Sequence, residues 1–356
     1  MSAIPRAFGA MVLVFCIGLA SHAQQASKTA SPTKAAPNSI DATAVAARVN
    51  NQVISEIALQ RGLKRIPADK QDQARPEILD YLIENLLIDQ YLQQLGEKVD
   101  KKEVDAKVKL IHEEIERKHE DYAKVMKELM LTDTELRTNI EAELRWNAYA
   151  EKQATDDQLK KLFSSDKEMF DGTMVRARHI LRSSGKESDR VKAGLLQVKK
   201  QIEDQVTQGL SKLPADTSKL NREKARQELL EKAFSDVARK ESECPATKDM
   251  GGDLQWFPRG GSMVEPFAKA AFSLPPFQIS DVVQTQFGYH LILVTDRKPG
   301  REVVFDEVKD EVKEVYFGQL RDRLIARVRP TAKITITPVG KTAGMKEEAK
   351  SDSGRN

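Results

Sequence analysis

The chain has 356 residues, of which 31% are charged and 6% aromatic, and its formal net charge is +3 at pH 7. This near-balance of charge excludes the broad basic surface that suits nucleic acid, so no nucleic-acid partner is expected. The composition indicates a well-solvated, helix-rich protein, and the length predicts two domains rather than one.

The first 23 residues predict a secretory signal peptide. Arg6 precedes an apolar run from Ala7 to Ala20, and the small residues Ser21 and Ala23 occupy the −3 and −1 positions of a cleavage site. The run is shorter than the roughly 20 residues of a membrane span. We therefore expect an exported chain with no stable membrane span after cleavage; an uncleaved N-terminal anchor is the alternative.

Two polar stretches border the expected folded part. Residues 24–42 predict a flexible linker and residues 337–356 a disordered tail, because both offer little to bury. Cleavage of the signal would remove Cys16 and leave Cys244 as the lone thiol, so no intramolecular disulfide is expected. A lone thiol in an oxidising compartment is either buried or reactive.

Residues 43–172 predict a mostly helical domain that opens with a short hairpin at Asn50-Asn51. A long amphipathic helix is expected to open at Pro76 and to end at Gly96, a residue typical of helix C-termini.

Three more helical segments are expected in the helical part of the chain. A charged stretch covers 101–130, a capping box at Thr132 starts the next helix, and a similar pattern recurs at Thr155. Charged helix returns at 305–328 near the end of the chain.

After Gly172 the pattern changes. Residues 175–181 alternate like a strand, 186–241 form a charged helical region broken near Pro214, and 288–294 are strongly strand-prone. The order predicts a compact α+β insert inside a helical protein.

The histidines offer the main candidates for chemistry. His112 and His119 lie on a charged helix, and Glu116 occupies the second ligand position of a zinc-protease motif, which excludes that reading. His179 and His290 each lie inside a strand-prone run, where a satisfied core histidine is the commoner case. No hydrolase triad is evident.

Several short segments follow one another in the mixed region: ARHIL (177–181), Phe234 to Cys244-Pro245, GGDLQWF (251–257), RGGSMVEPF (259–267), AAFSL (270–274) and TQFGYHLI (285–292). As an ordered set they resemble the parvulin rotamase motif. The resemblance implies a peptidyl-prolyl cis/trans isomerase domain over 173–298, with a small antiparallel sheet and surrounding helices, and it implies no cofactor and no metal.

The resemblance also implies roles for particular residues. His179 and His290 match the paired active-site histidines, Cys244 matches a position that is Cys or Asp in parvulins, and Thr285 matches a polar residue near the pair. The apolar pocket for the proline ring is matched by Leu254, Met263 and Phe267.

The chain departs from the parvulin pattern in four places. The loop 259–263 has one residue more than usual, and the helical region between the first histidine and Cys244 is longer. Phe277 stands where a turn glycine is common, and Val282 where a proline is common.

The flanks, AARVNNQVISEIAL (46–59) and residues 75–105, resemble the N-terminal chaperone domain of SurA-type periplasmic foldases. This implies that a C-terminal helix within 303–336 completes the helical domain, and that the chain works in the periplasm on unfolded, proline-containing polypeptides, with envelope association left open. The expected function is therefore a folding isomerase and chaperone. The alternatives that stay open are a non-catalytic holdase with the parvulin unit as a binding platform, and a homodimer through the helical domain.

Overall fold

A computed structural model describes residues 44–183 and 187–338. The expected signal peptide, the linker and nearly all of the expected tail lie outside the described residues. The contacts divide the chain into two compact units, one over Asp156–Glu314 and one formed by the segments that end at Thr155 and begin at Val315. In the described ranges no helix is both long and apolar enough to cross a membrane.

The helical unit contains a small sheet in the order β2-β1-β7. Strand β1 (Val45–Val49) pairs antiparallel with β2 (Gln52–Ser55) and with β7 (Ile334–Ile336). The expected turn at Asn50 is confirmed, with φ of 54°, a conformation that asparagine tolerates better than most residues.

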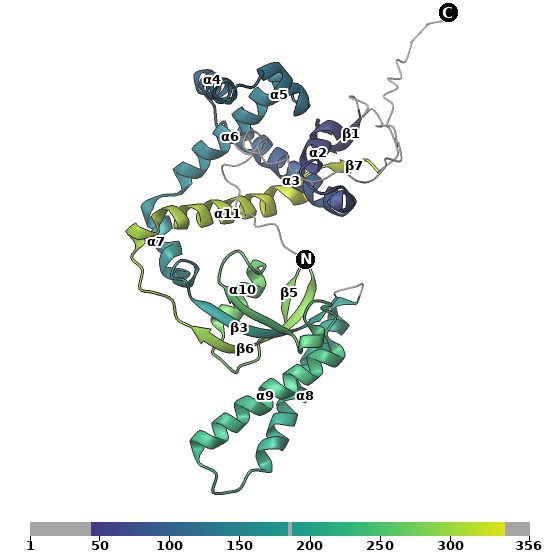
Figure 1. Cartoon of the computed structure of the whole chain (residues 1–356), viewed down its shortest axis with the longest axis vertical. Coiled ribbons are helices and arrows are strands. Elements are labelled where there is room, and N and C mark those ends of the chain that lie inside the picture. Colours follow the sequence, from purple (N-terminus) through teal and green to yellow (C-terminus); the bar gives the residue numbers. More distant parts are fainter. Residues whose placement is uncertain (1–43, 184–186, 339–356) are drawn as a thin grey trace, which may run out of the picture. The chain divides into compact units, whose positions relative to one another are not determined.

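The α-helices of the helical unit are drawn from purple to teal in Figure 1, except for the last. They are α2 (Glu56–Leu63), α3 (Ala68–Gln94), α4 (Lys101–Arg117), α5 (Tyr122–Glu128), α6 (Asp133–Gln153) and the part of α11 (Lys309–Val328) that begins at Val315. The capping box at Thr132 is present, with the Thr132 side chain and Glu135 bonded to each other's backbone N–H.

Three details of the helical part differ from the sequence-based expectation. Helix α3 opens at Ala68, so Pro76 lies inside it rather than at its start. The expected helix over 101–130 is two helices, because His119 adopts a left-handed φ of 58° between them. The C-terminal helix ends at Val328, as the expected range 305–328 does, but a strand that was not expected, β7, follows it as a β-branched run and completes the sheet.

The other unit, which we call the sheet unit, is built on a second antiparallel sheet in the order β4-β3-β6-β5. Besides short 3-10 turns and the start of α11, its elements are α7 (Asp156–Ser165), β3 (Met174–Arg182), α8 (Ser188–Ser211), α9 (Lys219–Glu241), β4 (Asp253–Pro258), α10 (Glu265–Ser273), β5 (Val283–Thr285) and β6 (Gly288–Lys298). The strands expected at 175–181 and 288–294 are confirmed as the central pair, and the helical region does break at Pro214. The α+β class is confirmed as well.

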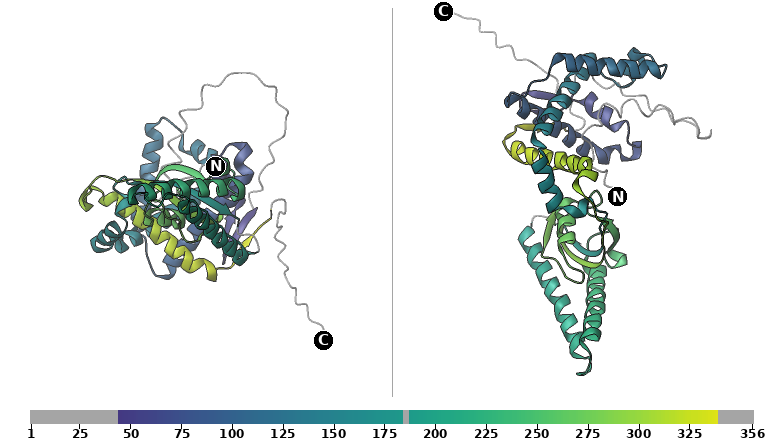
Figure 2. Two further views of the ribbon diagram at one scale, coloured as in Figure 1. Left: turned by 90° about the horizontal axis from the view of Figure 1, so that it is seen from below. Right: turned by 90° about the vertical axis from the view of Figure 1, so that its left-hand side faces the viewer.

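Helices cover both faces of this sheet (Figures 1 and 2). The hairpin of α8 and α9 packs on one face through a cluster that includes Ile202, Phe234 and Ile180 of β3. Helix α10 packs on the other face through Phe267 and Phe272. Strand β3 is therefore buried from both sides, which is why Ile180 is as buried as the alternating residues Val175 and Ala177.

The structure corrects the domain expected for one helix and shows the backbone conformation of one unusual residue. Helix α7, expected in the helical domain, belongs to the sheet unit, where Phe163 packs against Phe170 and Phe305. Phe277, expected in place of a turn glycine, adopts a left-handed φ of 60°. A phenylalanine therefore occupies a conformation that glycine would adopt without strain.

Candidate active site

Two buried histidines meet on the central strands of the sheet unit. His179 lies on β3 and His290 on β6. The two residues are 5% and 4% exposed. The imidazole rings stack with 5.6 Å between centroids, and the two Nδ1 atoms are 3.4 Å apart. The sequence placed both in strands, and the pairing of β3 with β6 brings them together across 111 residues.

A threonine hydroxyl lies at each outer end of the histidine pair. His179 Nε2 is 2.9 Å from Thr247 Oγ1, and His290 Nε2 is 2.8 Å from Thr285 Oγ1. Thr285 Oγ1 also accepts the backbone N–H of Phe287 at 3.1 Å. The four side chains form one continuous hydrogen-bonded row.

The protons of this row can be arranged in two directions, and burial favours one of them. Thr247 is 7% exposed, and in the described part of the chain its hydroxyl is hydrogen-bonded only to His179. If Thr247 donates to His179, then His179 Nδ1–H donates to His290 and His290 Nε2–H donates to Thr285. This direction leaves no buried hydroxyl hydrogen without an acceptor, whereas the opposite one does. It also frees the hydrogen of the half-buried Thr285 hydroxyl for solvent or substrate.

Both imidazoles are neutral at physiological pH. Burial lowers the pKa of His179 from its ordinary 6.5 to about 4. Burial, reinforced by the neighbouring His179, lowers the pKa of His290 to about 4. The site therefore offers hydrogen-bonding groups without a net charge.

The loop from Ser242 to Gly252 packs against the backbone of His179. The Gly252 carbonyl accepts the His179 backbone N–H at 2.9 Å, and a Cβ added at Gly252 would lie 2.3 Å from the His179 carbonyl oxygen. With φ of 78°, Gly252 needs both the space and the backbone freedom of glycine. The same loop carries Cys244, which is half-buried with a free thiol and whose backbone carbonyl accepts the Thr247 N–H at 3.4 Å.

Thr247 is the residue of the row that the sequence did not reveal. It lies three residues after Cys244 in a loop without periodicity, and only the folding of this loop brings its hydroxyl to His179. The only sequence signal was its place between Cys244 and the Gly251-Gly252 turn.

Apolar side chains border the other side of the histidines. Phe267 presents an edge-to-face contact to each ring, with centroids 5.7 Å from His179 and 5.2 Å from His290. Leu254 and Met263 are half-buried and pack against the same apolar cluster as Phe267. The three residues expected to form the pocket thus share one side of the sheet.

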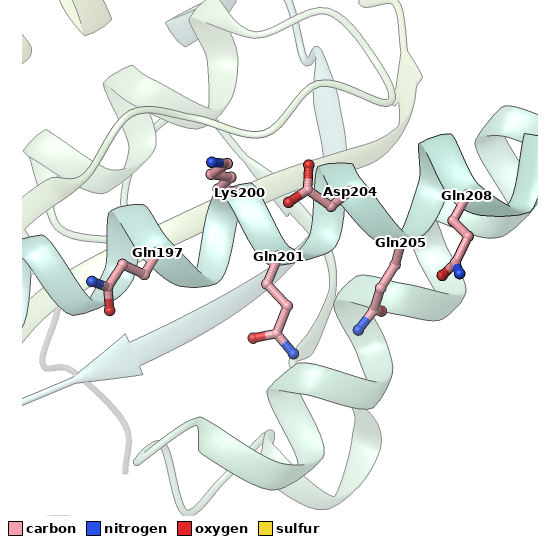
Figure 3. A pocket seen from close by; sticks show the side chains of 6 residues that line it. All are labelled: Gln197, Lys200, Gln201, Asp204, Gln205 and Gln208. Atoms are coloured by element: carbon pink, nitrogen blue, oxygen red, sulfur yellow. The ribbon is translucent and has the colours of Figure 1, made fainter.

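Other recesses and clusters are unrelated to this arrangement. One recess lies along α8, and Figure 3 shows its polar lining side chains projecting from that helix: Gln197, Lys200, Gln201, Asp204, Gln205 and Gln208. None of them belongs to the histidine row. Among the described residues no group of three His, Cys, Asp or Glu side chains could hold a metal ion.

Comparison with known proteins identifies the family. A family model described as the PPIC-type PPIASE domain matches residues 215–298. Foldase protein PrsA of Caldanaerobacter subterraneus is 30% identical over 257 residues, which are 72% of this chain and 69% of that protein.

A probable parvulin-type peptidyl-prolyl cis-trans isomerase of Bordetella pertussis is 38% identical over 102 residues, 28% of this chain and 39% of that protein. A crystal structure of PrsA from Bacillus anthracis is 22% identical with a TM-score of 0.40, and the match covers 71% of this chain and 97% of that one. The expected parvulin-type isomerase is confirmed by the sequence relatives. The chain belongs to the PrsA family of foldases and is a peptidyl-prolyl cis/trans isomerase with a parvulin-type domain.

Proposed function

We propose that the chain isomerises X-Pro bonds in unfolded, exported polypeptides at the site formed by His179, His290 and the apolar residues beside them. The observation that carries this proposal is the pairing of two neutral, buried imidazoles with an aromatic wall at Phe267. The proposed proline pocket consists of Leu254, Met263 and Phe267.

The reaction needs no bond to be broken. Rotation about the X-Pro amide has a barrier of about 20 kcal/mol because the twisted amide loses its resonance. A catalyst that binds the twisted form more tightly than the planar one lowers this barrier. An apolar pocket can hold the proline ring and exclude water, and the neutral histidines border it without adding a charge that would need solvation.

The polar residues of the site receive supporting roles in this mechanism. The Thr285 hydroxyl hydrogen, left free by the direction of the row, can reach a substrate oxygen at the half-buried end of the site. Thr247 fixes the tautomer of His179 from the other end. Cys244, in the loop that carries Thr247, acts electrostatically near the substrate carbonyl and not by covalent attack.

The helical unit supports a chaperone role in the same chain. Between α4 and α6 lies a mainly apolar recess that is lined by Glu103, Ala106, Lys107, Leu110, Leu144, Asn147, Ala148 and Glu151. Leu110 is 60% exposed there. Such a surface suits apolar segments of an unfolded chain. The predicted signal peptide and the SurA-like flanks support a periplasmic location, and the recess supports holdase activity beside catalysis.

The proposed catalysis is tested with a prolyl-isomerisation assay on a short X-Pro peptide. We expect His290→Ala to lower kcat/KM by on the order of 100-fold, the usual loss when one preorganised hydrogen-bonding group is removed. His112→Ala is the matched control, because that histidine stacks on Tyr122 in the helical unit, whereas the histidine row belongs to the sheet unit. A wild-type rate equal to the uncatalysed one would reject the enzyme proposal, and suppression of client aggregation would then identify a holdase.

The holdase part has its own test. Leu110→Asp should weaken suppression of aggregation of an unfolded client and leave isomerisation of the short peptide unchanged. An unchanged suppression would exclude the α4–α6 recess as a client surface.

A further inference from the structure

Arg259 is a buried charged residue for which the mechanism above has no use. It directly follows β4 and is only 4% exposed. Its Nη1 donates to Glu265 Oε2 at 2.8 Å, and its Nη2 donates to Glu265 Oε1 at 2.7 Å. Nη2 also reaches Asp166 Oδ1 at 3.3 Å. Such a two-pronged arginine–carboxylate contact fixes direction as well as distance.

This contact joins three elements of the sheet unit. Arg259 stands at the end of β4, Glu265 is the first residue of α10, and Asp166 directly follows α7. Met263 lies two residues before Glu265 and Phe267 two residues after it. The arginine therefore holds the short stretch of chain that bears two of the three proposed pocket residues.

Between the two ends of this contact, Met263 and Val264 pack against the apolar cluster of Phe267, but the glycines before them have no close neighbours. A Cβ added at Gly260 or Gly261 would meet no atom within 4 Å, so the loop passes through open space there. The N-cap residue of α10, Val264, makes no side-chain capping hydrogen bond. The position of Met263 consequently depends on its apolar packing and on the ends of the loop, which Arg259 and Glu265 link.

We infer that Arg259 is a positioning residue that sets the geometry of the proline pocket through Glu265. The inference rests on the proposed function, since it assigns the pocket to Met263 and Phe267. It predicts an effect on the pocket and not on the hydrogen bonds of the histidine row, because that row includes neither Arg259 nor Glu265. Loss of the contact should therefore weaken substrate binding and leave the histidine row as it is.

The test compares Arg259→Met and Arg259→Lys in the full chain, with kcat and KM measured separately on a short X-Pro peptide. We expect Arg259→Met to raise KM about tenfold, the size expected when hydrogen bonds to a charged group are lost. The value of kcat and the tautomers of His179 and His290, read from the ring ¹⁵N signals, should stay unchanged, because the hydrogen-bonded row sets them. Arg259→Lys keeps the charge and should recover part of the loss.

The matched control is Arg145→Lys, which alters another buried arginine–carboxylate pair, in the helical unit. It should change neither kcat nor KM on the short peptide. If Arg259→Met does not fold, Glu265→Gln tests the same contact from a side chain that is 55% exposed.

An unchanged KM in a folded Arg259 variant would overturn the inference. So would a joint change of KM and the imidazole tautomers, since that marks a general structural role. A wild-type chain without isomerase activity would reject both the proposed function and this inference. An active wild type whose Arg259 variants keep the wild-type KM would reject only the inference.

Discussion

Each unit of the chain buries a pair of polar side chains, but one pair is charged and the other is neutral. In the helical unit Arg145 of α6 donates to Asp89 of α3, and both residues are 8% exposed. In the sheet unit His179 and His290 are buried as deeply, but neither carries a charge at neutral pH.

The surroundings of the two pairs explain the difference. The Asp89 carboxyl has an opposite charge beside it, and Arg145 is further satisfied by the Glu97 carbonyl at 3.1 Å. Burial raises the pKa of Asp89 while Arg145 opposes that shift. The histidines have hydroxyls and an aromatic ring for neighbours, so they remain uncharged. A compensated charge pair links two helices, whereas an uncharged polar row beside apolar side chains can receive a substrate.

The largest expected effect concerns the charge pair. Asp89→Ala leaves the Arg145 guanidinium buried without its partner, and we expect it to lower the free energy of unfolding by about 3–5 kcal/mol. The isomerisation rate on a short peptide should not change. Urea unfolding followed by tryptophan fluorescence measures the loss, in a Trp256→Phe background that leaves Trp146, the neighbour of Arg145 in sequence, as the reporter.

The control for this substitution is Asp105→Ala, which removes an exposed ion pair with Arg137 in the same unit. It should cost far less stability than Asp89→Ala, because solvent screens an exposed ion pair. Equal effects of the two substitutions would show that burial does not distinguish the pairs.

The histidine pair predicts a dependence of stability on pH. The folded-state pKa values of about 4 lie below the ordinary 6.5 of an unfolded histidine. Between these two pH values the histidines of the unfolded chain bind protons, whereas those of the folded unit stay unprotonated. The stabilisation is therefore complete above pH 6.5 and is lost as the pH falls toward 4. The loss is on the order of 3 kcal/mol for one histidine, at about 1.4 kcal/mol per pKa unit.

This dependence is measured by urea unfolding of the sheet unit between pH 4 and 7.5, with His179→Gln as the reference. The variant should lose part of the slope. Activity of the wild type should stay level from pH 8 down to about 5.5, because a group with a pKa near 4 stays neutral over that range. Titration of either imidazole ring near pH 6.5 in NMR spectra would contradict the lowered pKa values.

A smaller effect tests the residue at the end of the row. Thr247→Val leaves His179 Nε2 buried without a partner, which should cost about 1–3 kcal/mol of stability and lower kcat/KM. Thr295→Val is the matched control: Thr295, on β6, is 9% exposed and donates to the Arg176 carbonyl at 3.3 Å. That control should affect stability alone, and equal kinetic losses would deny Thr247 a special role.

The smallest expected effect concerns the backbone beside the site. Gln255 is exposed and adopts a left-handed φ of 61° in β4. Gln255→Gly should stabilise the sheet unit by about 0.5–1 kcal/mol, because glycine adopts this conformation without steric cost. Gln284→Gly, in the exposed part of β5, should destabilise it. Thermal melting of both variants measures the difference, and a fall in Tm for Gln255→Gly would contradict the strain.

Much of the sheet unit could be predicted because its signals are local. The alternation over 175–181 and the β-prone run over 288–294 predicted the central strands, and Pro214 predicted the break between α8 and α9. Both histidines came with those strands. The capping box at Thr132 is equally local, since its contacts span three residues.

The missed features depend on contacts that are distant in sequence. Strands β5 and β7 have three residues each, too few for a period to show, and their neighbours in the sheets define them. Thr247 reaches His179 only because its loop folds under β3. Pro76 marks a helix start in many sequences, yet the residues before it also favour a helix, so α3 begins earlier.

The pairing of β3 with β6 also bears on how the enzyme matures. The two histidines come from the first and the last strand of the sheet, so they cannot meet until nearly the whole sheet unit has been made and folded. Contacts between such distant segments form slowly compared with the local contacts of a helical hairpin. The isomerase activity thus reports that this unit has finished folding, and a foldase of this design begins to isomerise prolines in other chains only after its own most distant strands have paired.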